Sequence, residues 1–355
     1  MTMQIELPAQ RSLLGAIFWR NRLFLSIVAL YVLAGVGVSL AKNVSFWSGT
    51  VPVLLGILDI FKLMLISFAT IWIIWRFIYA ATSVKPEKPI HWLLADLRGA
   101  VLNSMNLVDG TLCFMAVGFM AATFTFFKDL IPSFQPFSWD PQFAELDRFL
   151  HGGVDAWTLL WPVFGTPLFT TVLNAAYHAW FILLYVAVFV AAFDRRDPER
   201  SMAFLVAFSL TWIVGGTVLA TLFSSAGPVY YQAFGFGDTF AAQMQKLAEL
   251  NEISPVWSLE VQQILLDNYR ADGPVRGISA MPSMHVATSV LLALFAFSYS
   301  RVLGWAMAVF AGSILIGSVH LGWHYAVDGY FSIVIAGICW WFAKTLAKRF
   351  SDPSY

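Results

Sequence analysis

Two short motifs in the last quarter of the chain place histidines beside groups that could act on a phosphate ester. The first is a Pro-Ser-Met-His run at residues 282–285, and the second places His324 four residues before Asp328. Residues four apart share one face of a helix, so the Asp328 carboxylate could orient the His324 imidazole and make it a better nucleophile. Imidazoles titrate near neutrality, so one histidine could attack while the other donates a proton.

The first motif has the composition of a helix start. Proline is tolerated in the first helical turn, and the free N–H groups of that turn form a ready anion site. Ser283 could add a hydroxyl donor to a bound phosphate, and His285 would lie within reach of a phosphoryl oxygen or a leaving group. The alternative is an ordinary helix start with a polar cap.

The second motif also leaves alternatives open. His324 and Asp328 could be a buried hydrogen-bonded pair that only ties two helices together. His320 lies four residues before His324, so the three side chains could instead bind a metal ion. No glutamate follows either histidine as in zinc proteases, and we therefore expect a catalytic site that needs no metal and no other cofactor.

These motifs belong to a chain with the composition of a membrane protein. Of its 355 residues, 59% are hydrophobic and only 12% are charged, and the mean hydropathy is +0.71. The 21 Lys and Arg residues balance 21 Asp and Glu residues, which argues against a nucleic-acid partner. The expected fold is an all-α, multi-pass membrane helix bundle. Apolar windows predict eight spans, at 22–41, 53–79, 108–127, 171–193, 202–223, 283–300, 302–319 and 325–343.

Positive charges predict the orientation of the bundle. Most Lys and Arg residues, Arg11 and Arg195 among them, fall on one side if the N-terminus is cytoplasmic. Because cytoplasmic loops carry the excess of these residues, both termini are expected in the cytoplasm, as in a bacterial inner membrane. The two motifs then face the extracytoplasmic side.

The spans suggest three regions. Residues 1–106 form an N-terminal two-span region with a cytoplasmic linker, 107–343 a six-helix catalytic domain, and 344–355 a cytoplasmic tail. Two long segments of the catalytic domain are extracytoplasmic. Segment 128–170 combines proline with tryptophan and suits short helices at the headgroup level, and 224–282 is long enough to cover the helix ends.

Taken together, the two motifs resemble the second and third signatures of the type 2 phosphatidic acid phosphatase superfamily. They lie 39 residues apart, from His285 to His324, with two apolar spans between them, as in that family. The resemblance implies a six-helix core and metal-free phosphoryl transfer on a lipid phosphate or phospholipid. It implies that His324, oriented by Asp328, attacks phosphorus, that His285 protonates the leaving oxygen, and that water or an alcohol resolves the phosphohistidine.

Two departures from the family pattern narrow the resemblance. The first signature, a lysine followed by Arg-Pro, is absent, and Ser-Ala-Gly-Pro-Val-Tyr-Tyr occupies residues 225–231 in its place. Ser318 replaces the arginine that usually precedes the third signature. The branch that resembles inositol phosphorylceramide synthases shares both losses. A transferase that uses a polyol or lipid acceptor is therefore as compatible with the sequence as a lipid phosphatase.

Without the usual cationic pair, other groups must bind the phosphate. We expect Arg270 and Arg276, just before the second signature, to do so, and Tyr230 and Tyr231 to bind acceptor hydroxyls. His320 is a further candidate for phosphate binding.

His178 falls one helical turn after Asn174. It could line the substrate cavity or form a hydrogen bond between helices. A transporter or scramblase with a His/Asp proton or headgroup site is the alternative function. Such a protein has no need of the paired motifs and usually shows internal repeats, so we favour an enzyme.

Overall fold

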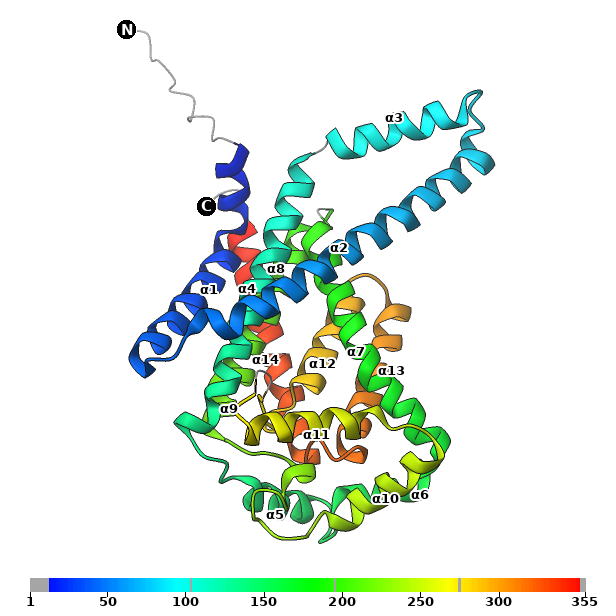
Figure 1. Ribbon diagram of the computed structural model, residues 1–355. Coiled ribbons are helices and arrows are strands. Elements are labelled where there is room, and N and C mark those ends of the chain that lie inside the picture. The colour runs from blue at the N-terminus through cyan, green and yellow to red at the C-terminus, as the bar shows by residue number, and fades with distance from the viewer. Residues whose placement is uncertain (1–12, 103, 195, 274–275, 352–355) are drawn as a thin grey trace.

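The computed structural model describes residues 13–102, 104–194, 196–273 and 276–351 (Figure 1). Arg11, Arg195 and the last four residues of the predicted tail lie outside these ranges. Within them the chain is helical and contains no strand. The prediction of an all-α bundle is therefore confirmed.

Among the described residues, seven helices are long and apolar enough to cross a membrane. They are α1 (Leu13–Lys42), α2 (Phe46–Tyr79) with its π-helical extension η1 (Ala80–Val84), α4 (Ser104–Phe134), α7 (Pro167–Phe193), α8 (Pro198–Leu210) continued by π-helical η2 (Thr211–Leu219) and by α9 (Ala220–Leu222), α13 (Arg301–His320), and α14 (Ala326–Ser351).

The sequence predicted eight spans, and the sixth of them is shorter than expected. Segment 283–300 folds as α12 (Met284–Phe297), whose 14 residues rise only about 21 Å. A hydrocarbon core is about 30 Å thick, so this helix alone does not cross it. The helix is apolar and largely buried, and it packs against α7, α8, α13 and α14. Its N-terminus, with the first motif, is thereby enclosed by the bundle.

Short helices gather at one end of the bundle (Figure 1). They are α5 (Asp140–Leu150), α6 (Ala156–Phe164), the 3-10 turn η3 (Pro228–Tyr230), α10 (Ala241–Ile253) and α11 (Trp257–Arg270). The start of α1 and the end of α14 lie at the opposite end, on the same side as α3 (Pro89–Leu102). Segments 128–170 and 224–282 therefore share one face of the protein.

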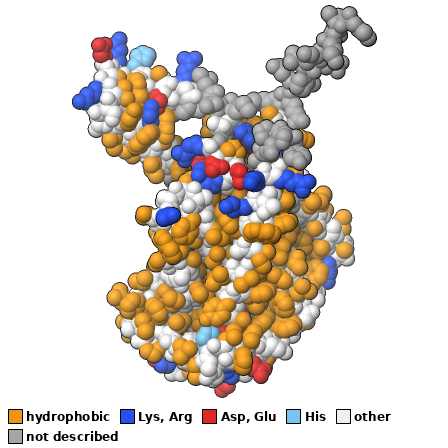
Figure 2. Space-filling model, turned by 180° about the vertical axis from the view of Figure 1, so that it is seen from behind, with side chains coloured by type: hydrophobic (Ala, Val, Ile, Leu, Met, Phe, Trp, Pro, Cys, Tyr) orange, Lys and Arg blue, Asp and Glu red, His pale blue; other side chains and the backbone are white. Residues whose placement is uncertain are grey.

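The outer surface suits a bilayer. Figure 2 shows hydrophobic side chains over most of the helical body, with Lys, Arg, Asp and Glu gathered towards the end where α1 begins. Lys62 lies on apolar α2 and pairs with Asp59, one turn away, at 3.0 Å. The charge of this lysine is thereby balanced within its own helix.

Candidate active site

A cavity of about 370 Å³ lies between α4, α7, η2, α11, α12 and the turn before α14. This volume is within the range of small-molecule sites. The side chains of Lys128, His178, His285 and His324 line it, together with several aromatic rings. The structure therefore brings the histidines of both motifs to one cavity.

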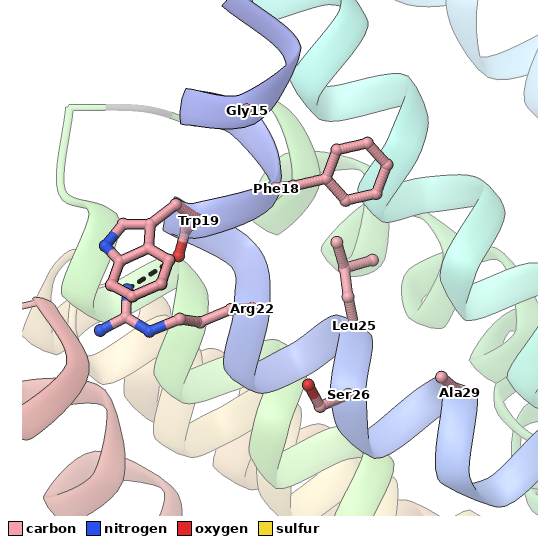
Figure 3. Close-up of a pocket in the computed structure, with 7 residues that line it drawn as sticks. All are labelled: Gly15, Phe18, Trp19, Arg22, Leu25, Ser26 and Ala29. Atoms are coloured by element: carbon pink, nitrogen blue, oxygen red, sulfur yellow. Dashed lines mark hydrogen bonds between the residues drawn. The ribbon is translucent and has the colours of Figure 1, made fainter. Parts of the chain in front are cut away.

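A second hollow, of about 640 Å³, runs along α1 and contains no comparable chemistry (Figure 3). Residues of this single helix line it, and its one charged group, Arg22, donates a hydrogen bond to the carbonyl oxygen of Trp19 at 2.8 Å. Its lining residues include neither an imidazole nor a carboxylate. It is not a candidate catalytic site.

His324 and Asp328 meet through a turn and not on one helical face as the spacing suggested. His324 precedes the first residue of α14, whereas Asp328 belongs to the first turn of that helix. The Nδ1 atom of His324 lies 3.3 Å from Oδ2 of Asp328, which also accepts the backbone N–H of Tyr325 at 3.1 Å. Because Asp328 engages Nδ1, Nε2 is the nitrogen left to act as a nucleophile.

His285 is the second residue of α12 and lies among aromatic rings. Its ring centroid is 4.3 Å from that of Tyr177, nearly parallel to it, and 4.1 Å from that of Trp180. Ser283 is fully buried and caps the helix, since its Oγ accepts the N–H of Val286 at 3.4 Å. Ser283 is not among the lining residues, so the structure gives it the role of the polar cap.

Lys128 is the cation of the cavity, and the sequence analysis assigned it no role. Its carbon stem packs against Gly277, where a Cβ atom would lie 2.9 Å from Cγ and Cδ of the lysine. In the part of the chain that the structure describes, its Nζ forms neither a hydrogen bond nor an ion pair. A lysine at the end of a span usually only reaches towards the headgroups, so the sequence around it carries no distinctive signal.

Three residues that line the cavity carry a buried donor that has no acceptor among the described residues. The hydroxyl of Tyr177 and the indole N–H groups of Trp212 and Trp323 are buried, and no partner for them occurs among the described residues. The lining residues include no carboxylate. Together with Lys128, these donors suit an anion that carries several oxygen atoms.

The structure does not bring the two predicted arginines to the cavity. Arg276 pairs with Asp272, and Arg270 lies exposed at the end of α11. Neither side chain is among the lining residues.

Of the two tyrosines predicted to bind acceptor hydroxyls, only one lines the cavity. Tyr230 lines the cavity, although its hydroxyl donates to the carbonyl oxygen of Gln262 at 3.0 Å. The ring of Tyr231 packs against Phe236 and Phe240 in a separate cluster.

Of the two remaining histidines predicted for the site, one lines the cavity and the other lies outside it. His178 lines the cavity, and its Nδ1 bonds to the carbonyl oxygen of Asn174 within α7 at 2.8 Å. The hydrogen bond between helices is made by Asn174 of α7 and not by His178. The Oδ1 atom of Asn174 accepts from the hydroxyl of Ser258 in α11 at 2.9 Å. His320 is fully buried outside the cavity, where its Nε2 lies 2.9 Å from Oγ1 of Thr170. Among the described residues no three His, Cys, Asp or Glu side chains could together hold a metal ion.

The segment at 225–231, where the sequence lacks the first signature, joins both motifs. The carbonyl oxygen of Ser225 accepts the N–H of Ala280 at 2.9 Å, and the N–H of Val229 donates to Gly322 at 2.9 Å. Gly227 has a φ of +98°, and a Cβ there would lie 2.6 Å from the carbonyl oxygen of Trp323. Only glycine permits this close approach. The segment thus holds the turns that precede His285 and His324.

A buried carboxylate at the start of α5 holds this segment in turn. Asp140 accepts the N–H groups of Ala226 and Gly227 and the hydroxyl of Tyr325, each at 2.8 Å. Burial raises the pKa of Asp140, and the bonds from the two amides oppose this rise. Burial also raises the pKa of Tyr325, so its phenol remains a donor. Asp140 is therefore a positioning residue that connects α5 with both sides of the site.

We expect Asp140→Ala to destabilise the protein and remove most of its activity. Three buried donors would lose their acceptor, and each unsatisfied group costs about 1–3 kcal/mol. The melting temperature in detergent should fall clearly, and Asp140→Asn, which keeps one acceptor oxygen, should lie between it and the wild type. Asp238→Ala, at an exposed carboxylate, is the control. A wild-type melting temperature for Asp140→Ala would contradict this role.

The fold and the site define a membrane-embedded protein of the phosphatase type, because a basic and histidine-rich cavity at one end of an apolar bundle suits phosphate esters of lipids. The chain belongs to the PAP2 superfamily, whose profile matches residues 141–342, more than half of its length. No curated protein and no solved structure gives a significant match. Lys128 lies outside the matched region.

Proposed function

We propose that the protein transfers the phosphoryl group of a membrane lipid phosphate or phospholipid through a phosphohistidine on His324, without a metal ion. One observation carries the proposal: the Asp328-oriented imidazole and His285 share a cavity whose unpaired groups are donors and which no carboxylate lines. Such a cavity favours an anionic oxygen cluster over a metal ion or a cationic solute.

In the first step, Nε2 of His324 forms a bond to phosphorus as the bond to the leaving oxygen breaks. His285 gives its proton to that oxygen, and Asp328 stabilises the positive charge on the attacking imidazole. Lys128 and the three buried donors balance charge on the phosphoryl oxygens. In the second step, His285 takes a proton from water or an alcohol, whose oxygen displaces His324 from phosphorus.

We favour an alcohol over water as the acceptor, as in the branch that resembles inositol phosphorylceramide synthases. Supporting this choice, the first signature is replaced by the 225–231 segment, and Ser318 stands where an arginine is usual. Helices α10 and α11 also lie on the end that holds the cavity. A transferase must keep water from its phosphoenzyme, and a cover of this kind serves that purpose.

Purified protein incubated with a labelled lipid phosphate or phospholipid, with and without inositol, glycerol, ceramide or diacylglycerol, tests the function. We expect a labelled new lipid when the right acceptor is present, unchanged turnover in EDTA, and inhibition by orthovanadate. Release of inorganic phosphate in every mixture would identify a phosphatase. Loss of turnover in EDTA that zinc restores would contradict the metal-free mechanism.

We also propose that the cavity opens on the extracytoplasmic side and that both termini are cytoplasmic, as the Lys and Arg distribution indicates. In intact cells, an impermeant maleimide should label Ala242→Cys in α10 but not Glu199→Cys in α8; both positions are exposed. The native cysteines, Cys113 and Cys339, are buried and should give little background. The reverse labelling pattern would invert the topology.

A further inference from the structure

A second, apolar crevice of about 190 Å³ adjoins the catalytic cavity. Helices α2, α4, α7 and α8 and the stretch η2 line it, and almost all of its lining side chains are apolar. The lining residues include no charged side chain. The crevice therefore suits a hydrocarbon and not a headgroup.

The crevice and the cavity share part of their lining. Phe124, Trp180, Phe181 and Trp212 line both of them. Beyond these four shared residues, the lining of the cavity includes Lys128 and the histidines, whereas the lining of the crevice follows α4 to Phe114. A molecule with a phosphate at one end and a hydrocarbon chain at the other matches this pair of spaces.

The length of the crevice agrees with part of an acyl chain. Phe124 and Phe114 are ten residues apart on α4, which corresponds to about 15 Å along the helix. Phe181, which lines both spaces, has 51% of its surface exposed.

The N-terminal helix α2 completes the crevice. Val53 and Ile57 of α2 form its outer wall opposite α4, and a Cβ on Gly118 would lie 3.2 Å from the side chain of Ile57. These residues precede the region matched by the family profile. Helix α2 thus contributes directly to the wall of the crevice.

We propose that this crevice holds one acyl chain of the lipid donor and that α2 therefore helps to select the substrate by its chain. The inference rests on the proposed function, since it assigns the phosphate of the same lipid to the catalytic cavity. Moving a chain from bilayer to protein gains little hydrophobic free energy, so the fit of the chain decides the selectivity.

Ala121→Phe tests the proposal, because Ala121 lines the crevice but not the catalytic cavity. The measured quantity is kcat/KM for dioleoyl phosphatidic acid divided by kcat/KM for its dihexanoyl analogue. Filling the crevice should lower this ratio at least about tenfold, since small changes in an apolar pocket already discriminate by such factors. Ala306→Phe, at an exposed alanine of α13, is the matched control and should leave the ratio unchanged. An unchanged ratio in Ala121→Phe would overturn the proposal.

A binding measurement separates this proposal from the proposed function. A phosphatidic acid with a photoreactive acyl chain should label the peptides that contain Val53 to Ile57 and Val117 to Ala121, without any turnover. Labelling should persist in Ala306→Phe and be lost in Ala121→Phe. Absence of label from these peptides in the wild type would refute the crevice as a chain site, even if phosphoryl transfer is observed. Labelling without turnover would support the crevice while contradicting the function.

Discussion

His324→Ala is expected to lower kcat by about 10⁴-fold or more, because it removes the atom that forms the bond to phosphorus. His324 is 94% buried, and among the described residues its ring makes a hydrogen bond with Asp328, through Nδ1 at 3.3 Å. Loss of this side chain should leave membrane insertion and the elution profile in detergent intact. Single-turnover kinetics with a labelled lipid phosphate measure the effect.

Two further variants sharpen this test. Asp328→Asn keeps the size of the side chain but cannot stabilise an imidazolium, and it should cost on the order of 10²–10⁴ in rate. His151→Ala removes an imidazole that bonds to Tyr330 outside the cavity, and it should retain turnover. Acid-labile label on the wild type, absent from His324→Ala, would identify the phosphohistidine. Near-normal turnover in purified His324→Ala would refute the assignment.

Lys128→Met should lower kcat/KM by about 10²–10³-fold, the range observed when one charge-stabilising donor is removed from an active site. The methionine keeps the stem that packs against Gly277 but removes the cation. Because the phosphate is charged in both the ground state and the transition state, KM should rise while kcat falls. Initial rates over a range of lipid concentrations in mixed micelles separate the two effects.

The controls compare this cation with others at the same end of the protein. Lys42→Met alters a lysine whose Nζ donates to the carbonyl oxygen of Ser133 at 3.2 Å, and it should retain activity. Arg270→Met tests the residue that the sequence favoured and should have a smaller effect than Lys128→Met. A greater loss in Arg270→Met would mean that α11 rearranges to bring the arginine over the phosphate.

The sequence predicted the parts of the site that depend on local order along the chain. Apolar windows located the spanning helices, and the spacing of His285 and His324 placed two imidazoles at one end of the bundle. The short α12 was overestimated because Ser298 to Ser300 continue an apolar window although the helix ends at Phe297. Hydropathy reports composition and does not report where a helix stops.

The missed cation depended on contacts between distant segments. Lys128 precedes His285 by 157 residues, and no pattern connects them along the chain. Arg270 and Arg276 were favoured because they are near the second signature in sequence, but Asp272 engages Arg276, and Arg270 is exposed and does not line the cavity. The positioning role of Asp140 could likewise not be predicted from the sequence, because its three hydrogen-bond partners are the distant residues 226, 227 and 325.

The second helix, α2 with its extension η1, is longer than a bilayer is thick, so its tilt depends on the thickness of the membrane. The continuous helical stretch Phe46–Val84 has 39 residues, which corresponds to about 58 Å, nearly twice the hydrocarbon core. It cannot stand upright, and in Figure 1 it slants across the bundle. A thicker bilayer favours a steeper helix and a thinner one a flatter helix. Val53 and Ile57 on this helix line the proposed acyl crevice. A change in membrane thickness that tilts the helix would therefore change the width of the crevice, without any ligand bound to the protein.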